Sequence, residues 1–214
     1  HVVEDIPKTV QNYKKGWSPN FYRENFHRNA ISKPIEKCEP NDLILISDAD
    51  EIPNFESIKN NKIKKFALLS QRNFYYKLNL QSSNDWLGTG ICYKKYLKSP
   101  QWLRNLKFKK RPFWRIDKIR LNNIINDGGW HFCNLKSAEN LLYKYSNLCE
   151  TNDPVNFKEK IDKKFLDVNE IKKKVLKGED IIGRDDNFKK VTLDSSFPIY
   201  LRENKNKYKE WIDE

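Results

Sequence analysis

Three carboxylate side chains follow directly after an aliphatic run in the segment LILISDADEIPN, residues 43–54. The aliphatic run predicts a buried strand, and residues two apart in an extended chain point to the same side. Asp48 and Asp50 are therefore expected to face one point in space beyond the end of that strand. Two converging carboxylates repel each other unless a cation lies between them, and oxygen ligands suit Mg²⁺ or Mn²⁺. The pattern predicts a divalent-cation site at Asp48 and Asp50, with Glu51 beside it; the alternative is a solvated acidic loop.

A second candidate segment is DGGWHF, residues 127–132. Two consecutive glycines allow backbone angles that are closed to other residues, and they allow a ligand to approach the backbone closely. Trp130 offers an apolar ring of the kind that packs against a sugar face, and His131 is suited to complete a metal site or to donate to a diphosphate. The alternative for His131 is a hydrogen-bonded core residue, and for Asp127 it is a turn residue before glycine.

The elements that position these segments indicate an α/β fold. Apolar residues recur at roughly helical spacing over 21–38, where Pro34 predicts a kink or two short helices. The strand at 43–47 follows and is expected to be the central strand of an α/β sandwich. Further expected elements are a strand at 1–6, a loop at 7–20, a short helix at 54–61, one or two strands at 64–80, a glycine turn at 88–90, a strand at 113–121, a turn and strand within 126–135, helices at 137–148, 156–166 and 168–177, and a terminal helix.

The composition predicts a single domain over residues 1–214 with an excess of positive charge. Hydrophobic residues make up 38% and aromatic residues 13%, which is enough for one core and argues against disorder. The net charge of +12 favours an anionic partner such as a nucleotide diphosphate, nucleic acid or acidic membrane surface; the alternative is a solvated lysine-rich surface. The four cysteines form no CxxC pair, so we expect reduced thiols and no zinc site.

The ends of the chain carry two further expectations. It contains no methionine and opens on HVVEDIP, which is typical of the end of a strand, so we expect an N-terminally truncated domain. No apolar run approaches the length needed to cross a bilayer, and no signal-peptide pattern opens the chain. A cytoplasmic location is the expectation for the chain as given.

The segments NDLILISDADEIPN and GGWHF together resemble glycosyltransferase family 17, the family of bisecting N-acetylglucosaminyltransferases. Four more segments fall in the family's order: FHRNAI, YKYSNL, IKKKVLKGEDIIGR and FPIYLREN. The resemblance thus covers nearly the whole chain. It has two departures. Cys133 and Asn134 follow Phe132 where family members often have a serine and an aromatic residue, and the segment that should carry the first nucleotide-binding strand is missing.

This resemblance implies a GT-A-like fold, a mixed sheet flanked by helices, and metal-dependent inverting transfer of N-acetylglucosamine from UDP-GlcNAc to a glycan or glycoconjugate acceptor. A metal ion at the two aspartates would neutralise the departing diphosphate. An inverting transfer needs a carboxylate as general base, for which Asp127 and Glu51 are the candidates. The candidate donor- or substrate-binding residues are Arg28, Trp86, Arg120, Trp130 and Lys144, and the candidate metal ligands are Asp48, Asp50 and His131.

Three other functions stay open at this point. The net charge of +12 with interleaved aromatic residues is compatible with a nucleic-acid-binding protein, although no helix-turn-helix, zinc-finger or RNA-recognition signature occurs. Paired aspartates also serve metal-dependent nucleases and nucleotidyltransferases, which usually add a third carboxylate cluster where this chain has His131 and glycines. The third alternative is a degenerate fragment that keeps the fold without turnover.

Overall fold

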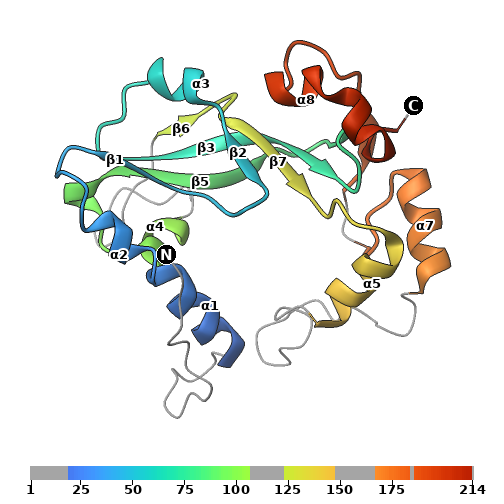
Figure 1. Cartoon of the computed structure of the whole chain (residues 1–214), viewed down its shortest axis with the longest axis horizontal. Helices are drawn as coiled ribbons and strands as arrows, with labels where there is room; N and C mark the ends of the chain where they lie inside the picture. The colour runs from blue at the N-terminus through green and yellow to red at the C-terminus, as the bar shows by residue number, and fades with distance from the viewer. Residues whose placement is uncertain (1–18, 107–122, 148–166, 184–185, 214) are drawn as a thin grey trace, which may run out of the picture. The chain divides into compact units, whose positions relative to one another are not determined.

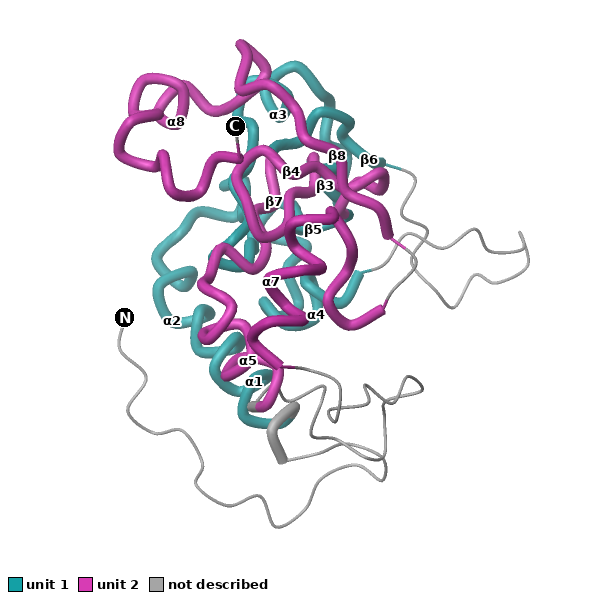
Figure 2. The backbone as a smooth tube through the Cα atoms, turned by 90° about the vertical axis from the view of Figure 1, so that its right-hand side faces the viewer, with its two compact units in different colours: residues 1–71, 87–129 teal, residues 72–86, 130–214 magenta. Residues whose placement is uncertain are grey.

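The structure is a computed structural model that describes residues 19–106, 123–147, 167–183 and 186–213. The chain divides into two compact units, unit 1 with residues 1–71 and 87–129 and unit 2 with residues 72–86 and 130–214 (Figure 2). The strands pair in the order β1 (Leu43–Ile46), β5 (Trp86–Tyr93), β3 (Phe66–Tyr75), β4 (Leu80–Ser82) and β8 (Phe188–Lys190). Strands β2 (Glu51–Pro53), β6 (Ile124–Ile125) and β7 (Gly129–Cys133) lie off this path. Helices and a mixed sheet confirm the α/β class (Figure 1). The elements expected at 1–6, 113–121 and 156–166 lie outside the described residues.

Unit 1 contains the segment with the three carboxylates. Its strand β1 pairs antiparallel with β5, and the first half of β3 pairs parallel with β6. Two helices precede β1, where the sequence predicted a kink or two short helices over 21–38, but the break between them lies at residues 30–31 and Pro34 is inside the second helix. The short helix predicted after Pro53 is confirmed. The elements are α1 (Pro19–Asn29), α2 (Ser32–Ile35), β1 (Leu43–Ile46), β2 (Glu51–Pro53), α3 (Phe55–Lys59), the first part of β3 (Phe66–Tyr75), β5 (Trp86–Tyr93), η1 (Lys94–Tyr96), α4 (Pro100–Arg104) and β6 (Ile124–Ile125).

Among the strands that the structure describes, β1 stands at one end of the order, whereas the sequence predicted a central strand. Its side chains divide between two core clusters. Leu43 and Leu45 pack against the cluster that includes α3, whereas Ile44 and Ile46 belong to the cluster that includes α4. Helices thus cover both faces of an end strand (Figure 1). A strand that is packed on both faces reads as a continuous aliphatic run, which is the pattern of a central strand.

The predicted turn at residues 88–90 is also wrong, because these residues lie inside β5. Thr89 has no exposed surface, and Gly90 faces helix α4. A Cβ at Gly90 would lie 3.0 Å from both the Cγ and the carbonyl oxygen of Leu103. The glycine therefore serves the close packing of the helix on the strand, not a reversal of the chain.

Unit 2 contains the histidine of the second candidate segment. The second half of β3 pairs parallel with β7, with Asn73 opposite His131, and antiparallel with β4, which pairs with β8. The predicted helix over 168–177 is confirmed: Asp167 caps its start, and Gly178 ends it at φ +67°. The elements are β4 (Leu80–Ser82), β7 (Gly129–Cys133), α5 (Ala138–Asn147), α7 (Val168–Lys177), β8 (Phe188–Lys190), α8 (Ile199–Glu203) and the 3₁₀ segment η3 (Lys205–Trp211).

The core of unit 2 consists of two clusters. Tyr75, the last residue of β3, and Tyr76, which follows it, pack with α5, α7 and Phe188 of β8. Phe74 and Phe132 pack instead with residues of the C-terminal segment, including α8. Phe74 and Tyr75, neighbours within β3, thus serve different clusters, as alternating side chains require. One consequence matters for the site: Phe132 belongs to a core cluster, while the side chains on either side of it in β7 point to the other face.

Candidate functional site

In unit 1, the carboxylate of Asp48 is held by two arginines. Arg104 at the end of α4 donates from Nε at 3.0 Å and from Nη2 at 2.5 Å to Oδ2 of Asp48. Arg28 at the end of α1 reaches Oδ1 at 3.5 Å, and also donates to Glu24 at 2.8 Å and to Gln101 at 2.5 Å. Asp48 therefore lies in an ion-pair network that joins its loop to two helices.

Three carboxylates stabilise the positive charge of Arg104. Burial lowers its pKa, but the hydrogen bond and charge of Asp48, with the charges of Glu51 and Asp50, outweigh burial and hold the pKa above its usual value. The guanidinium also lies 3.5 Å from Oε1 of Glu51. A positively charged side chain of α4 thus lies against the acidic loop of unit 1, and Arg104 is a site residue that the sequence analysis missed.

The candidate base Glu51 has a fully buried side chain with 0% exposure. Its Oε2 accepts hydrogen bonds from the backbone N of Thr89 at 2.7 Å, from Oγ1 of Thr89 at 2.8 Å and from the backbone N of Asp48 at 3.3 Å. These contacts anchor the acidic loop to β5. A carboxylate without exposed surface is out of reach of an acceptor hydroxyl in this structure, so its surroundings favour a structural role.

The other candidate base, Asp127, is an exposed residue at φ +50° in the turn before β7. Its carbonyl oxygen accepts from Nδ2 of Asn54 at 3.1 Å and from Oγ of Ser57 at 2.8 Å. The backbone of Asp127 is therefore fixed to the start of α3, while its carboxylate faces solvent. An exposed side chain is accessible to a substrate, and the role of Asp127 as general base stays a prediction.

The glycine pair after Asp127 is explained by contacts within unit 1. A Cβ on Gly129, which has φ +138°, would lie 2.0 Å from the carbonyl oxygen of Ile52, and one on Gly128 would lie 2.6 Å from the Cβ of Leu69. We expected the glycines to let a ligand approach. In the described structure they let β2 and β3 approach the turn, and the approach of a ligand stays a prediction.

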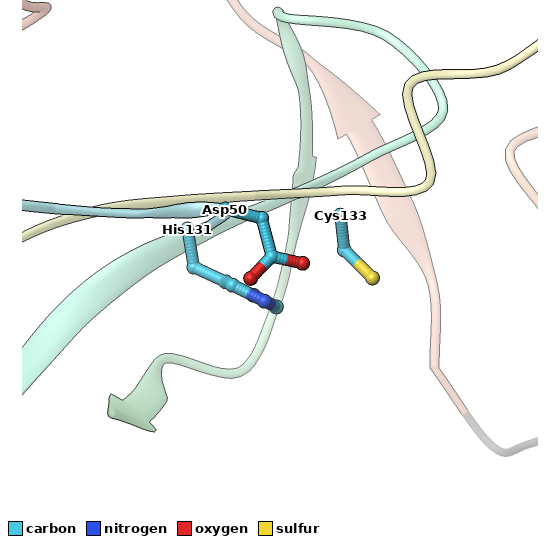
Figure 3. Close-up of side chains that lie close together, drawn as sticks. All are labelled: Asp50, His131 and Cys133. Carbon is cyan, nitrogen blue, oxygen red and sulfur yellow. The ribbon is translucent and has the colours of Figure 1, made fainter. Parts of the chain in front are cut away.

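In unit 2, two side chains orient His131. Its Nδ1 lies 2.8 Å from Oδ1 of Asn73 on the neighbouring strand, and its ring stacks on Trp86 with centroids 4.6 Å apart and an interplanar angle of 14°. An amide oxygen only accepts hydrogen bonds, so this contact requires a proton on Nδ1 of His131. Cys133, two residues further along β7, lies on the same face of the strand (Figure 3).

Among the residues that the structure describes, one group of three side chains can hold a metal ion: Asp50, His131 and Cys133 (Figure 3). The group offers a carboxylate, an imidazole and a thiolate. Imidazole and thiolate are poor ligands for Mg²⁺ and good ligands for Zn²⁺, so the donor set suits a transition metal ion.

Cys133 was not among the predicted ligands, because its sequence context has no paired cysteine. Its position two residues after His131 in a strand is the signal that would have identified it. Of the predicted metal ligands, Asp50 and His131 belong to this group, and Asp48 is ion-paired with the arginines.

The remaining predicted residues are distributed as follows. Trp130 donates from Nε1 to the carbonyl of Ser196 at 3.1 Å and packs against a core cluster of unit 2. Lys144 in α5 donates to Oδ1 of Asn134 at 2.7 Å. Both side chains are partly buried and have a structural partner. Arg120 lies outside the described residues.

Comparison with known protein families finds a match over nearly the whole chain. The family model described as Glycosyltransferase family 17 matches residues 6–209, which is nearly the whole chain. No curated protein and no solved structure matches the chain. Within the described parts of the chain, no helix is long and apolar enough to span a membrane.

Proposed function

Because the chain belongs to glycosyltransferase family 17, and is therefore a glycosyltransferase, we propose that it transfers N-acetylglucosamine from UDP-GlcNAc to a glycan acceptor with inversion at the anomeric carbon. Family membership implies a nucleotide-sugar donor and a glycan acceptor. The GT-A-like arrangement of the sheet, the identity of the sugar and the metal dependence are parts of this proposal.

The observation that carries the metal dependence is the set of donors offered by Asp50, His131 and Cys133. We assign these residues as ligands of one divalent ion, with Mn²⁺ preferred over Mg²⁺ because of the imidazole and the thiolate. The bound ion would supply a positive charge for the diphosphate oxygens of the donor. Asn73 and Trp86 act on His131: the hydrogen bond keeps the lone pair on Nε2, and the stacked ring fixes the plane of the imidazole.

We assign Asp48 a different task from Asp50. Its carboxylate holds Arg104 and Arg28, whose guanidinium groups are suited to bind phosphate oxygens. In this assignment the arginines add fixed positive charge for the leaving nucleotide, and Asp48 positions them. Lys144 and Arg120 are the other cations proposed for the donor, and Trp130 is proposed for the sugar.

We assign the general base to Asp127. Its carboxylate is exposed, its backbone is tied to Asn54 and Ser57, and an inverting transfer needs one carboxylate to take the proton of the acceptor hydroxyl. Glu51 is the weaker candidate because its side chain is fully buried and accepts hydrogen bonds from Thr89.

Calorimetric titration of the chain with UDP-GlcNAc and with other nucleotide sugars, each with and without Mn²⁺, tests the proposal. We expect UDP-GlcNAc to bind most tightly, and only with the metal. Asp50→Asn should abolish the metal-dependent part, whereas Glu56→Gln, a change at a side chain that is 76% exposed, should leave it unchanged. Donor binding that is independent of metal and of Asp50 would overturn the metal assignment, and the absence of binding to any nucleotide sugar would overturn the donor assignment.

A further inference from the structure

We propose that unit 2 contains a second binding site, which takes a sugar that carries a phosphate or carboxylate group. The site is a cavity of about 600 Å³, within the range of small-molecule pockets in proteins. Its walls come from the loop before β4, from β8 and the segment after it, and from η3 and the residues that follow it. The lining residues used below are Asn79, Lys190, Leu193, Lys205, Lys209, Ile212 and Asp213.

One buried side chain ties the walls of this cavity together. Nδ2 of Asn79 donates to the carbonyl of Asp213 at 2.8 Å, and the backbone N of Asp213 donates back to Oδ1 of Asn79 at 2.8 Å. The backbone carbonyl of Asn79 accepts from Val191 at 2.9 Å. Three separate segments are thus joined at one residue that is only 3% exposed. The cavity is therefore largely formed before any ligand binds, which lowers the entropic cost of binding.

A second contact braces the opposite wall. Nζ of Lys205, the first residue of η3, donates to the carbonyl of Leu193 at 2.9 Å. Leu193 itself is buried in the core cluster that fills this part of unit 2. The cavity thus has an apolar lining at Leu193 and the half-buried Ile212, against which the face of a sugar ring can pack.

The charge of the cavity selects the ligand. Three lysines, Lys190, Lys205 and Lys209, line it with one acidic residue, Asp213. The ion pair between Lys190 and Asp213 is long, at 4.0 Å, and both side chains are about half exposed, so it neutralises little of the charge. Ammonium groups donate strong hydrogen bonds to phosphate and carboxylate oxygens. An apolar lining with cationic side chains fits an anionic sugar better than a neutral one.

The proposed site shares no residue with the metal, diphosphate or base assignments made above. The statement that the bound sugar is part of a glycan rests on the proposed function. The prediction that the cavity binds an anionic sugar does not depend on it. Its chemical consequence is that the acceptor, or a neighbouring unit of the same glycan, carries a negative charge.

Titration of the full chain without metal and nucleotide tests the site. The probes are glucose 6-phosphate, glucuronic acid, glucose and inorganic phosphate. Calorimetry or the amide chemical shifts of unit 2 measure the binding of each probe. We expect one of the two anionic sugars to bind more tightly than glucose and than inorganic phosphate, and the tighter of the two identifies the anionic group. Binding should weaken as salt is added.

Two lysine variants and a matched control complete the design. Lys209→Gln and Lys190→Gln should each weaken the anionic sugar about fivefold, because each removes one partly exposed charged donor. Lys173→Gln, a change in the exposed lysine of α7 that pairs with Glu170 at 3.7 Å, should leave the affinity within about twofold.

Three results would each overturn the inference. The first is equal affinity for glucose and for both anionic sugars, and the second is equal affinity for inorganic phosphate and for the tighter of the two sugars. The third is an equal effect of Lys209→Gln and Lys173→Gln. Metal-dependent binding of UDP-GlcNAc, measured on the same samples, shows separately whether the proposed function fails.

Discussion

Arg104 directs two of its N–H groups at a single carboxylate oxygen of Asp48, from Nε at 3.0 Å and from Nη2 at 2.5 Å. The two residues are 56 positions apart in the chain, so this contact joins the end of helix α4 to the loop after β1. The first aspartate of the acidic motif thus has a protein cation as its partner. Asp48 and Asp50 are two residues apart in one loop, yet their surroundings differ. This difference underlies the separate tasks that we assign to them.

Arg104→Gln is expected to destabilise the protein by about 1–3 kcal/mol, since Asp48 and Glu51 would keep their negative charges without this cation. Urea unfolding measures the change. The control is Lys59→Gln, which removes an ion pair with Glu56 at 3.2 Å between side chains that are 70% and 76% exposed. That variant should stay within about 0.5 kcal/mol of the parent protein. Equal effects of the two variants would show that the Arg104 pair contributes no more than a surface ion pair.

In the variant Asn73→Leu, the proton of the His131 ring is expected to be no longer held on Nδ1. In the parent protein the hydrogen bond at 2.8 Å keeps the proton on Nδ1, and leucine offers no acceptor. Nitrogen-15 spectra of the metal-free protein report the tautomer directly, with the exposed His27 as an internal reference. Metal affinity should fall about tenfold in the same variant, and Asn73→Asp, which keeps an acceptor, should restore the Nδ1–H form. An unchanged tautomer in Asn73→Leu would show that another group orients the ring.

The sequence predicted the parts of this fold that depend on neighbouring residues. Helix α7 starts at an aspartate cap and ends at a glycine in the left-handed region, and both signals lie within the helix's own segment. Strand β1 was predicted correctly as a strand, but its place in the sheet was not, because helix packing on both faces produces the same aliphatic run as a central position.

Only the site residues that lie within the two sequence motifs were predictable. Asp50 and His131 were identified from their own segments, whereas Arg104 and Asn73 act through partners more than 50 residues away in the chain. Contacts at that separation depend on which strands pair and which helix covers them. No local pattern around Asn73 indicates that β3 lies parallel to β7 with this residue opposite the histidine.

Gly129→Ala is expected to destabilise the protein by more than about 3 kcal/mol, because a Cβ placed 2.0 Å from the carbonyl of Ile52 forces β2 away from the turn. Gly183→Ala is the matched control. It also has a positive φ, +77°, but nothing lies within 4 Å of the added Cβ, so it should cost only the backbone strain of roughly 1–2 kcal/mol. Thermal or urea unfolding of both variants separates close packing from backbone strain. Similar losses in the two would show that the approach of β2 is unimportant.

The thiol of Cys133 provides a covalent test of the metal assignment. Iodoacetamide should label Cys133 and Cys38, which are both partly accessible, whereas Cys92 should stay unlabelled because burial raises the pKa of its thiol to about 11. A saturating divalent metal ion should slow the labelling of Cys133 about tenfold, since a coordinated thiolate is no longer free to react. Peptide mapping after timed labelling measures each cysteine separately.

The internal control for this protection is Cys38, whose labelling should not respond to the metal. Asp50→Asn should remove most of the protection at Cys133, because we assign the carboxylate and the thiolate to one ion. Comparing Mn²⁺, Zn²⁺ and Mg²⁺ ranks the metals, and the thiolate predicts that Mg²⁺ protects least. Protection that persists in Asp50→Asn would assign the metal to His131 and Cys133 without the acidic loop, and absence of protection by all three ions would remove Cys133 from the ligand set.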